Sequence, residues 1–445
     1  MKFLKKSILF GSIFLSHNLN SWGKSAISES DTLRLSLNDV WHRADEYSRD
    51  IKIRKTAVSV SSEEIKDAKA ERLPEWNVAG SLEKATNIPI YENGIFHTPV
   101  QHEVIHTLYK AGTDFYLNIY NGNKLNLKIK EGKMLNVIAT IRKDQTISDT
   151  RYKAAALYLD LQKSIIFRDL MIHDIADQEK QLMEIKELHK NGVVLKSDVL
   201  RVEMELSRRK MTLVEIRNDI LIANQKLNIL IGEPDDRIVH PVDVFNPFHN
   251  VVQTYEGYLG DAMHHSFPFQ ISEKQTELSQ INLSKVKANV RPKIGMYGEF
   301  YFANPQIFLY PYNPYWYSLG IAGVKASFPL SSLYHNVHKV RAAKLELEKE
   351  EEIHKDTEDK VRQQVLEAFL RYKEALLQID VAKVNLEHAV ENERIIKNTY
   401  FNQTSLVTDL LDANVQELQS RFELAAAQIM AQNKFFLLQN VTGIL

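Results

Sequence analysis

Hydrophobic residues recur along most of this chain with the spacing of long helices that pack lengthwise. Between residues 213 and 230, and again between 411 and 429, apolar residues follow one another at alternating steps of three and four. A mean step of about 3.5 keeps one seam of a helix against its neighbour over the whole length. The pattern therefore predicts coiled-coil-like packing, which a compact core would not require.

The chain contains this helical pattern twice. Residues 191–232 match residues 402–443 at an offset of 211, and each copy has a polar turn, a Ser-Asp or Thr-Asp helix start and a Gly stop. In each half the two shorter helices together have about the length of the long one, so they can lie end to end beside it. The predicted helices cover residues 37–73, 124–189, 196–231, 255–290, 333–401 and 406–442.

Two stretches in each half change from the helical period to period two. The predicted strands cover about residues 75–84, 104–120, 293–303 and 315–328. In the first strand Trp76, Val78 and Leu82 alternate with polar or small residues. An apolar face opposite a polar one fits a strand between lipid and an aqueous lumen. A half-exposed strand of a soluble protein shows the same alternation.

Four strands are too few to close a barrel, and free strand edges are not tolerated in lipid. If these strands cross a membrane, several chains must therefore contribute to one barrel. The smallest symmetric solution with an adequate bore is three chains and twelve strands, although the sequence alone leaves other numbers open.

Composition and the N-terminus indicate a protein outside the cytoplasm. Residues 1–23 read as a signal peptide: Lys2, Lys5 and Lys6 precede an apolar run and then small residues. Lys plus Arg (56) nearly balance Asp plus Glu (57), which argues against a nucleic-acid surface. The absence of cysteine excludes disulfides and a cysteine-linked lipid anchor. We expect a first repeat over 24–232, a linker over 233–254 and a second repeat over 255–445.

The duplicated order helix, strand, strand, helix, turn, helix resembles that of the TolC-like outer-membrane factors. Its turn motifs are NGVVLKSDVL (191–200) and QTSLVTDLLD (403–412), and the resemblance covers essentially the whole mature chain. It implies a homotrimer in which a twelve-stranded β-barrel in the outer membrane continues as a long periplasmic α-helical barrel. It also implies a passive export duct without cofactor or catalytic residues, which docks on a periplasmic adaptor and an inner-membrane pump.

The resemblance also implies a gate at the periplasmic mouth. Asp409 and Asp412 lie three residues apart, on one helical face, and in a trimer they would form a ring of six carboxylates that repel one another and attract cations. The alternative is that Asp409 caps a helix, the role that we favour for Asp198 in the first copy. Gln403 and Ser405 stand where the family has Gly and an Arg that pairs with the first turn's Asp, which puts a lock to Asp198 in doubt.

The two turns are the predicted adaptor contacts, because turns at the tip of a tunnel are the surface that a periplasmic partner meets end-on. The residues concerned are Asn191, Gly192, Leu195, Ser197, Gln403, Ser405, Leu406 and Thr408. The alternative is plain connecting turns, with Leu195 and Leu406 tucked into the helix ends.

Two other functions are weighed against the export duct. A soluble periplasmic coiled-coil adaptor would share the long helices but not four strands of membrane length. A zinc hydrolase would use the motif His102-Glu103-Val104-Ile105-His106, in which two His one helical turn apart bind the metal. That chemistry needs a helix, whereas this segment is predicted to lead into a strand.

Overall fold

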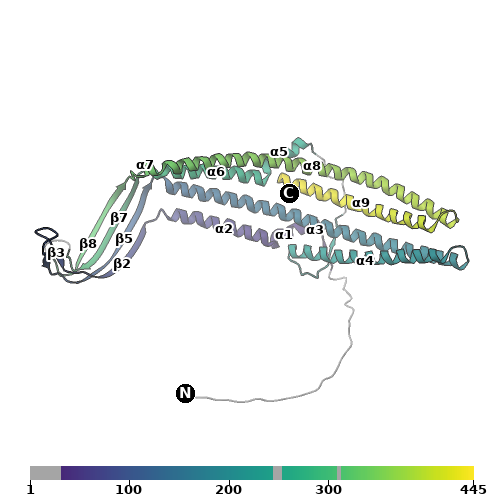
Figure 1. Ribbon diagram of the computed structural model, residues 1–445, viewed down its shortest axis with the longest axis horizontal. Coiled ribbons are helices and arrows are strands. Elements are labelled where there is room, and N and C mark those ends of the chain that lie inside the picture. The colour runs from purple at the N-terminus through teal and green to yellow at the C-terminus, as the bar shows by residue number, and fades with distance from the viewer. Residues whose placement is uncertain (1–31, 244–252, 308–311) are drawn as a thin grey trace, which may run out of the picture.

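The structure, a computed structural model, describes residues 32–243, 253–307 and 312–445. The molecule is long and narrow, with a sheet at one end and two helical turns at the other (Figure 1). The predicted signal peptide, residues 1–23, and positions 244–252 of the predicted linker lie outside the described residues. No helix in the described part of the chain is long and apolar enough to cross a membrane.

In the first half the long helix α3 (Lys124–Lys190) packs against α2 (Arg49–Ala70) along one part of its length and α4 (Lys196–Ile231) along another. The sequence predicts one helix over 37–73, but the structure has α1 (Leu37–Tyr47) and α2, interrupted at Ser48. Ser48 has an extended backbone (ψ 124°), which redirects the chain between the two helices.

The second half repeats this arrangement around the long helix α8 (Val337–Phe401), against which α9 (Val407–Thr442) packs. The helix predicted over 255–290 is again divided, into α5 (Tyr255–His265), α6 (Phe267–Lys287) and the 3-10 turn η3 (Ala288–Val290). The break lies at Ser266, with a ψ of 121°, and both serines are buried. Ser266 follows Ser48 by 218 positions, the offset that separates Pro292 from Pro74. Near the start of the long helix of this half, Asn336 separates the one-turn helix α7 (Ser332–His335) from α8.

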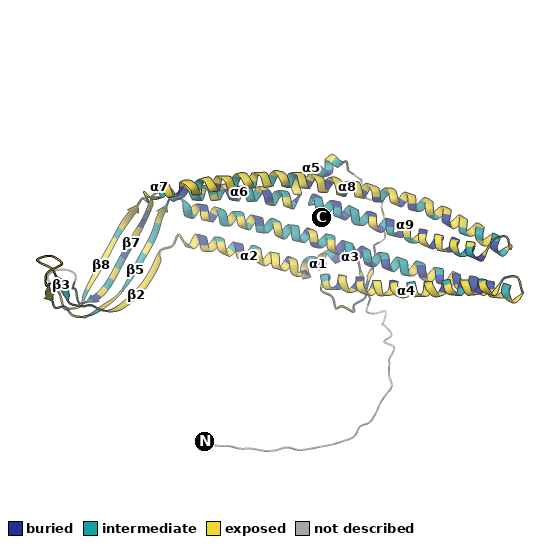
Figure 2. Ribbon diagram, viewed as in Figure 1, coloured by how far each residue is buried: buried dark blue, intermediate teal, exposed yellow. Residues whose placement is uncertain are grey.

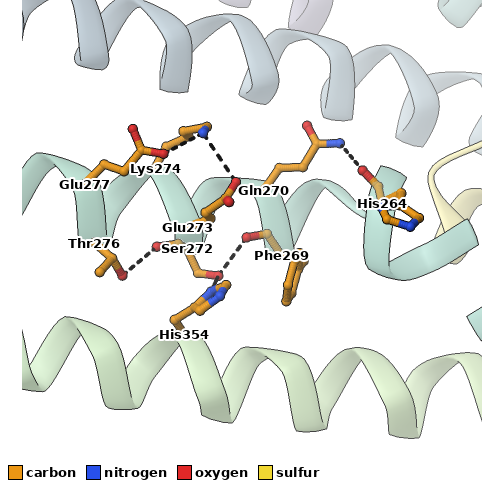
Figure 3. A network of polar contacts seen from close by, with 9 residues as sticks. All are labelled: His264, Phe269, Gln270, Ser272, Glu273, Lys274, Thr276, Glu277 and His354. Carbon is orange, nitrogen blue, oxygen red and sulfur yellow. Dashed lines mark hydrogen bonds and ion pairs between the residues drawn. The ribbon is translucent and has the colours of Figure 1, made fainter. Parts of the chain in front are cut away.

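A polar contact fixes α6 on α8, as Figure 3 shows. The Ser272 hydroxyl donates to the Phe269 carbonyl oxygen at 2.8 Å and lies 2.8 Å from Nδ1 of His354. The ring of His354 lies 4.7 Å from that of Phe269. This contact sets the position of α6 along the long helix.

The main sheet has the order β2-β5-β7-β8, with every neighbouring pair antiparallel. Its strands are β2 (Glu75–Lys84), β5 (Thr107–Asn121), β7 (Lys293–Asn304) and β8 (Tyr317–Ser327). Two smaller sheets were not predicted from the sequence, because one pairs segments that are distant in the chain and the other lies within a loop. A parallel pair joins β1 (Leu33–Leu35) to β6 (Val239–Pro241), and a short hairpin joins β3 (Ile88–Ile90) to β4 (Val100–His102).

The core is a series of seams between helices. In the middle of the molecule Val40, Tyr158 and Leu227 are almost fully buried, and the Tyr158 hydroxyl donates to the Leu35 carbonyl oxygen at 3.1 Å. A second cluster near the turns contains Ile185 and Leu410, from α3 and α9. The helices are therefore held along their length, as the 3.5-residue spacing predicts.

Candidate functional site

The two turns between α3 and α4 and between α8 and α9 lie together at the end opposite the sheet (Figure 1). Both turns close with an equivalent backbone hydrogen bond. Val193 N donates to Leu188 O, and Thr404 N donates to Thr399 O, each at 2.9 Å. Bonds of this kind satisfy the last carbonyls of a helix and require one residue with positive φ.

The residue with positive φ differs between the turns. Gly192 has a φ of +74° in the first turn, and Gln403 has a φ of +63° in the second. Glycine adopts this conformation without steric cost, whereas a residue with a Cβ pays about 1–2 kcal/mol. Gln403 therefore takes the backbone conformation that Gly192 has in the first turn, at an energetic cost.

Each turn ends in a leucine that starts the next helix and projects into solvent. Leu195 precedes α4 and Leu406 precedes α9, and their side chains are 70% and 68% exposed. The alternative in which these leucines tuck into the helix ends therefore does not hold in this chain. The other predicted contact residues are also accessible: Asn191, Gly192, Ser197 and Gln403 are exposed, and Ser405 and Thr408 are partly exposed.

Asp198 and Asp409 both bond to the backbone at these helix starts. The Asp198 carboxylate accepts from Leu195 N at 3.3 Å, and the Asp409 carboxylate accepts from Leu406 N at 3.1 Å. In return each aspartate N donates to the leucine carbonyl oxygen at 3.1 Å. Both carboxylates thus compensate the positive end of a helix.

Asp412 lies one turn further along α9. It is exposed and forms no ion pair with another described residue. Its charge therefore has no structural role in the single chain, in contrast to that of Asp409.

A residue that the sequence analysis missed, Tyr400, connects the two turns. Its side chain is buried in the cluster shared by both helical hairpins, and its hydroxyl has no hydrogen-bond partner among the described residues. Burial raises the pKa of Tyr400, and the nearby negative charge of Asp198 raises it further. The second hairpin thus places a phenol, not an arginine, near the aspartate of the first. The 211 offset matches Tyr400 with His189, but no local pattern in the sequence indicates its burial near Asp198.

The first hairpin also contains a buried ion pair. The Arg209 guanidinium on α4 is 3% exposed and contacts the Asp174 carboxylate on α3, and Nε of Arg209 lies 3.6 Å from Glu205. Burial raises the pKa of Asp174, although Arg209 opposes this effect. At the matching positions the second hairpin has Asn385 and Ser420. There, an open cleft of about 500 Å³ lies between α8 and α9.

At the other end, the two faces of the main sheet differ in chemistry. One face carries Trp76, Val78 and Leu82 of β2, which are 64%, 87% and 68% exposed, and β2 is coloured as exposed throughout in Figure 2. The strand register places Phe115 of β5 beside Trp76 on the same face. No other element of the described chain covers this apolar surface.

The opposite face of the sheet is polar. Asn77 donates to the Asp114 carboxylate at 3.1 Å, and Lys110 forms a 2.7 Å ion pair with Glu299. The ammonium group of Lys110 also lies 4.0 Å from the centre of the Tyr301 ring. Lys110, Asp114 and Glu299 line a hollow of about 210 Å³, together with small residues of β2 and β5.

On this polar face two glycines allow a close approach of the neighbouring strand. A Cβ on Gly112 would come within 2.5 Å of the Tyr301 Cβ, and a Cβ on Gly295 would come within 2.4 Å of the Tyr116 hydroxyl. Gly112 thus admits the backbone of β7, and Gly295 leaves room for the Tyr116 ring to lie across it.

The segment of the zinc motif is not helical. His102 ends β4, and His106 immediately precedes β5. Nδ1 of His106 lies 2.9 Å from the Ala85 carbonyl oxygen. The helical turn that would bring two histidines to one metal ion is therefore not formed by these residues.

Comparisons with known proteins agree with this geometry. No family model and no curated protein matches the sequence. Among solved structures the outer-membrane channel OprN matches with a TM-score of 0.76 and 14% identity, over 92% of this chain and 89% of that one. The outer membrane protein VceC from Vibrio cholerae gives 0.73 and 15%, over 92% and 96%. CusC, whose structures describe transmembrane channel formation, gives 0.78 and 12%, over 92% of both chains.

At these identities the matches establish the fold. This chain has the fold of an outer-membrane channel, with the sheet and the long helices in one continuous protomer. It is the fold of a protomer of the TolC-like proteins, which confirms the predicted combination of long helices and a four-stranded sheet in one chain.

Proposed function

We propose that this protein is the outer-membrane channel-tunnel of a multi-component export system. Three copies form a homotrimer, in which twelve strands close a barrel in the outer membrane and the helices continue it as a tunnel through the periplasm. The duct is passive: it docks on a periplasmic adaptor and an inner-membrane transporter, which supply the energy. The matched structures are channels and not enzymes, which supports this assignment.

The exposed apolar face of the main sheet is the observation that carries the proposal. It leaves Trp76, Val78 and Leu82 uncovered beside a face that carries charges. In water such a surface is unfavourable by about 25 cal/mol for each Å² exposed. In a membrane, lipid covers the apolar face, and a water-filled lumen solvates the charged face.

The two edges of the sheet indicate how the barrel is completed. In the described chain β2 pairs only with β5, and β8 pairs only with β7. The outer backbone groups of both edge strands therefore need partners before the sheet can enter lipid. Pairing β2 of one copy with β8 of the next satisfies both edges and generates a closed ring.

The alternative, a soluble periplasmic coiled-coil adaptor, explains the helices but not the sheet. Such a protein has no use for four long antiparallel strands with an uncovered aromatic and aliphatic face. The same surface would also be an aggregation hazard in the periplasm.

At the tip we propose that Asp409 and Asp412 of three copies form the ring of carboxylates at the periplasmic mouth. The free charge of Asp412 supports this role. We propose that the exposed leucines, Leu195 and Leu406, and the turns around them are the contacts for the adaptor. The exposure of both leucines at the tip supports that assignment.

The absence of native cysteine allows a direct test of the trimer. Pairs of cysteines, such as Ala79→Cys with Ile321→Cys and neighbouring registers, place one thiol on β2 and one on β8. We expect oxidation in membranes to give covalent dimers and a closed trimer on denaturing gels. Each single-cysteine variant is the matched control and should remain monomeric. Extraction of the wild-type protein into detergent-free buffer as a monomer would contradict the proposal and favour the soluble adaptor.

A further inference from the structure

The corner where the sheet meets the helices is strongly basic in the second half of the chain. From Leu278 to Leu345 the sole acidic residue is Glu299, which lies in the middle of β7. The basic residues in this range are Lys285, Lys287, Arg291, Lys293, Lys325, Lys339, Arg341 and Lys344. A region of this size with balanced surface charge would contain several carboxylates, so the local excess needs an explanation.

Little of this charge is neutralised within the chain. Lys285 pairs with Glu131 at 2.6 Å, but Lys287, Arg341 and Lys344 are exposed and form no ion pair with a described residue. Lys124 of α3, Lys293 of β7 and Lys339 of α8 also lie near one another here. Burial lowers the pKa of Lys124, and the charges of Lys293 and Lys339 lower it further.

The same corner exposes apolar and aromatic side chains. Between β8 and α8 the chain passes through Phe328, Leu330 and the short helix α7, which carries Leu333 and Tyr334. Leu330 is 68% exposed and Tyr334 is 66% exposed, and Phe328 and Val337 are exposed on either side. In the first half no such segment exists, since β5 passes directly into α3 through Gly122 and Asn123.

The corner is a fixed part of the fold. Arg291 donates to the Gly122 carbonyl oxygen at 3.3 Å, which joins the start of β7 to the end of β5. Asn336, between α7 and α8, donates to Val286 O at 2.8 Å and accepts from Asn289 at 2.9 Å. The apolar segment and the basic helix ends therefore keep a constant position at the end of the sheet.

We propose that this corner, residues 328–344 with Lys287, is an anchor that binds anionic phospholipid headgroups of the periplasmic leaflet. Protein segments that bind at membrane surfaces commonly combine aromatic side chains at the interface with basic side chains above it. Each Lys or Arg near an anionic surface strengthens binding to it. The inference rests on the proposed function, because it needs the sheet to lie in a membrane.

The test measures which lipids the full-length protein retains. Wild-type protein is reconstituted into vesicles of phosphatidylcholine alone or mixed with phosphatidylglycerol, re-extracted in detergent and washed, and its bound lipid is measured by mass spectrometry. The test variant combines Lys287→Gln, Arg341→Gln and Lys344→Gln. The matched control combines Lys196→Gln, Arg201→Gln and Arg217→Gln on α4, which removes the same charge from exposed, unpaired positions distant from the sheet.

We expect wild-type and control protein to retain phosphatidylglycerol in preference to phosphatidylcholine. In the test variant this preference should fall about tenfold. High salt should weaken the wild-type preference as well. Equal loss in test and control variants, or no loss in either, would overturn the inference. So would complete displacement of the lipid by inorganic phosphate, because that result would indicate a site for a small anion.

The vesicle step separates this inference from the proposed function. Failure of the wild-type protein to insert into vesicles of either composition would overturn both. Insertion into both compositions without preferential retention of phosphatidylglycerol would overturn the anchor alone. Circular dichroism of both variants checks that the substitutions leave the helices intact.

Discussion

The two helical hairpins have nearly the same length, similar turns and a capping aspartate at the same position, but they are held together differently. The first contains the buried Arg209 and Asp174 pair and turns on Gly192. The second has Ser420 and Asn385 at the matching positions, with an open cleft between its helices, and turns on a strained Gln403. Duplication thus preserved the path of the chain while the internal contacts diverged.

This difference indicates which hairpin moves more readily. A buried ion pair costs much to separate, because parting the charges leaves one of them unsolvated. The second hairpin has an open polar cleft at the matching position and lacks that restraint. If the periplasmic mouth opens by displacement of one hairpin, we expect the second hairpin, α8 and α9, to be the moving part.

Removal of the buried guanidinium should have the largest effect. Arg209→Met leaves the Asp174 carboxylate buried without its partner, and we expect the free energy of unfolding to fall by about 3–5 kcal/mol. Denaturation in detergent, followed by circular dichroism, measures this loss. The counterpart in the second hairpin, Ser420→Ala, and the exposed neighbour, Arg208→Met, should each cost less than about 1 kcal/mol. Similar losses in all three variants would contradict the difference between the hairpins.

The same variant should respond to acid. Burial raises the pKa of Asp174 above its ordinary value of 3.8, and Arg209 opposes that rise. Without Arg209 the folded state binds a proton more tightly than the unfolded chain, so stability is present at low pH and is lost as pH rises through the folded-state pKa. The deficit of Arg209→Met should therefore shrink on acidification, whereas that of Ser420→Ala should not.

Exchange of the two turn residues should give an intermediate effect. Gly192→Gln forces a Cβ into a positive φ in open space, and we expect a loss of about 1–2 kcal/mol from backbone strain alone. Gln403→Gly removes the strain of the second turn, but glycine also gains about 0.4–1 kcal/mol of freedom in the unfolded chain, so the net gain should be smaller. Hydrogen exchange of the turn amides measures both changes. Destabilisation by Gln403→Gly would show that Gln403 makes a contact that outweighs its strain.

The smallest expected effect concerns the two aspartates of α9. Asp412→Asn removes a free charge and relieves its repulsion from Asp409, so we expect stability to rise by a few tenths of a kcal/mol. In planar bilayers the preference of the channel for cations should fall. Asp409→Asn should lower the same preference and also weaken the start of α9. An unchanged ion preference in both variants would exclude the proposed carboxylate ring.

Much of the fold could be predicted because each element has its own local signal. The alternation around Trp76 and Val78 predicts β2, and the prolines at 74 and 292 end the helices before the strands. The breaks at Ser48 and Ser266 carry a weaker signal, since serine also occurs inside helices. The pairing of β1 with β6 joins segments about 200 residues apart, and no local pattern indicates it.

The site could be predicted only in part. The caps at Asp198 and Asp409 follow from the repeated helix start. The burial of Arg209 could not be predicted, because a charged residue on a long helix ordinarily lies in solvent. Tyr400 lies opposite Asp198 only after two hairpins have packed, so its environment depends on tertiary contacts.

Gly295 sets how far one tyrosine projects from the polar face, because the ring of Tyr116 lies across it. A ring that lies along the wall takes less space in the lumen of the proposed trimer than a ring that stands upright. Substitution of Gly295 by a larger residue would displace the Tyr116 ring toward the lumen, and it would narrow the passage for large solutes more than for small ions.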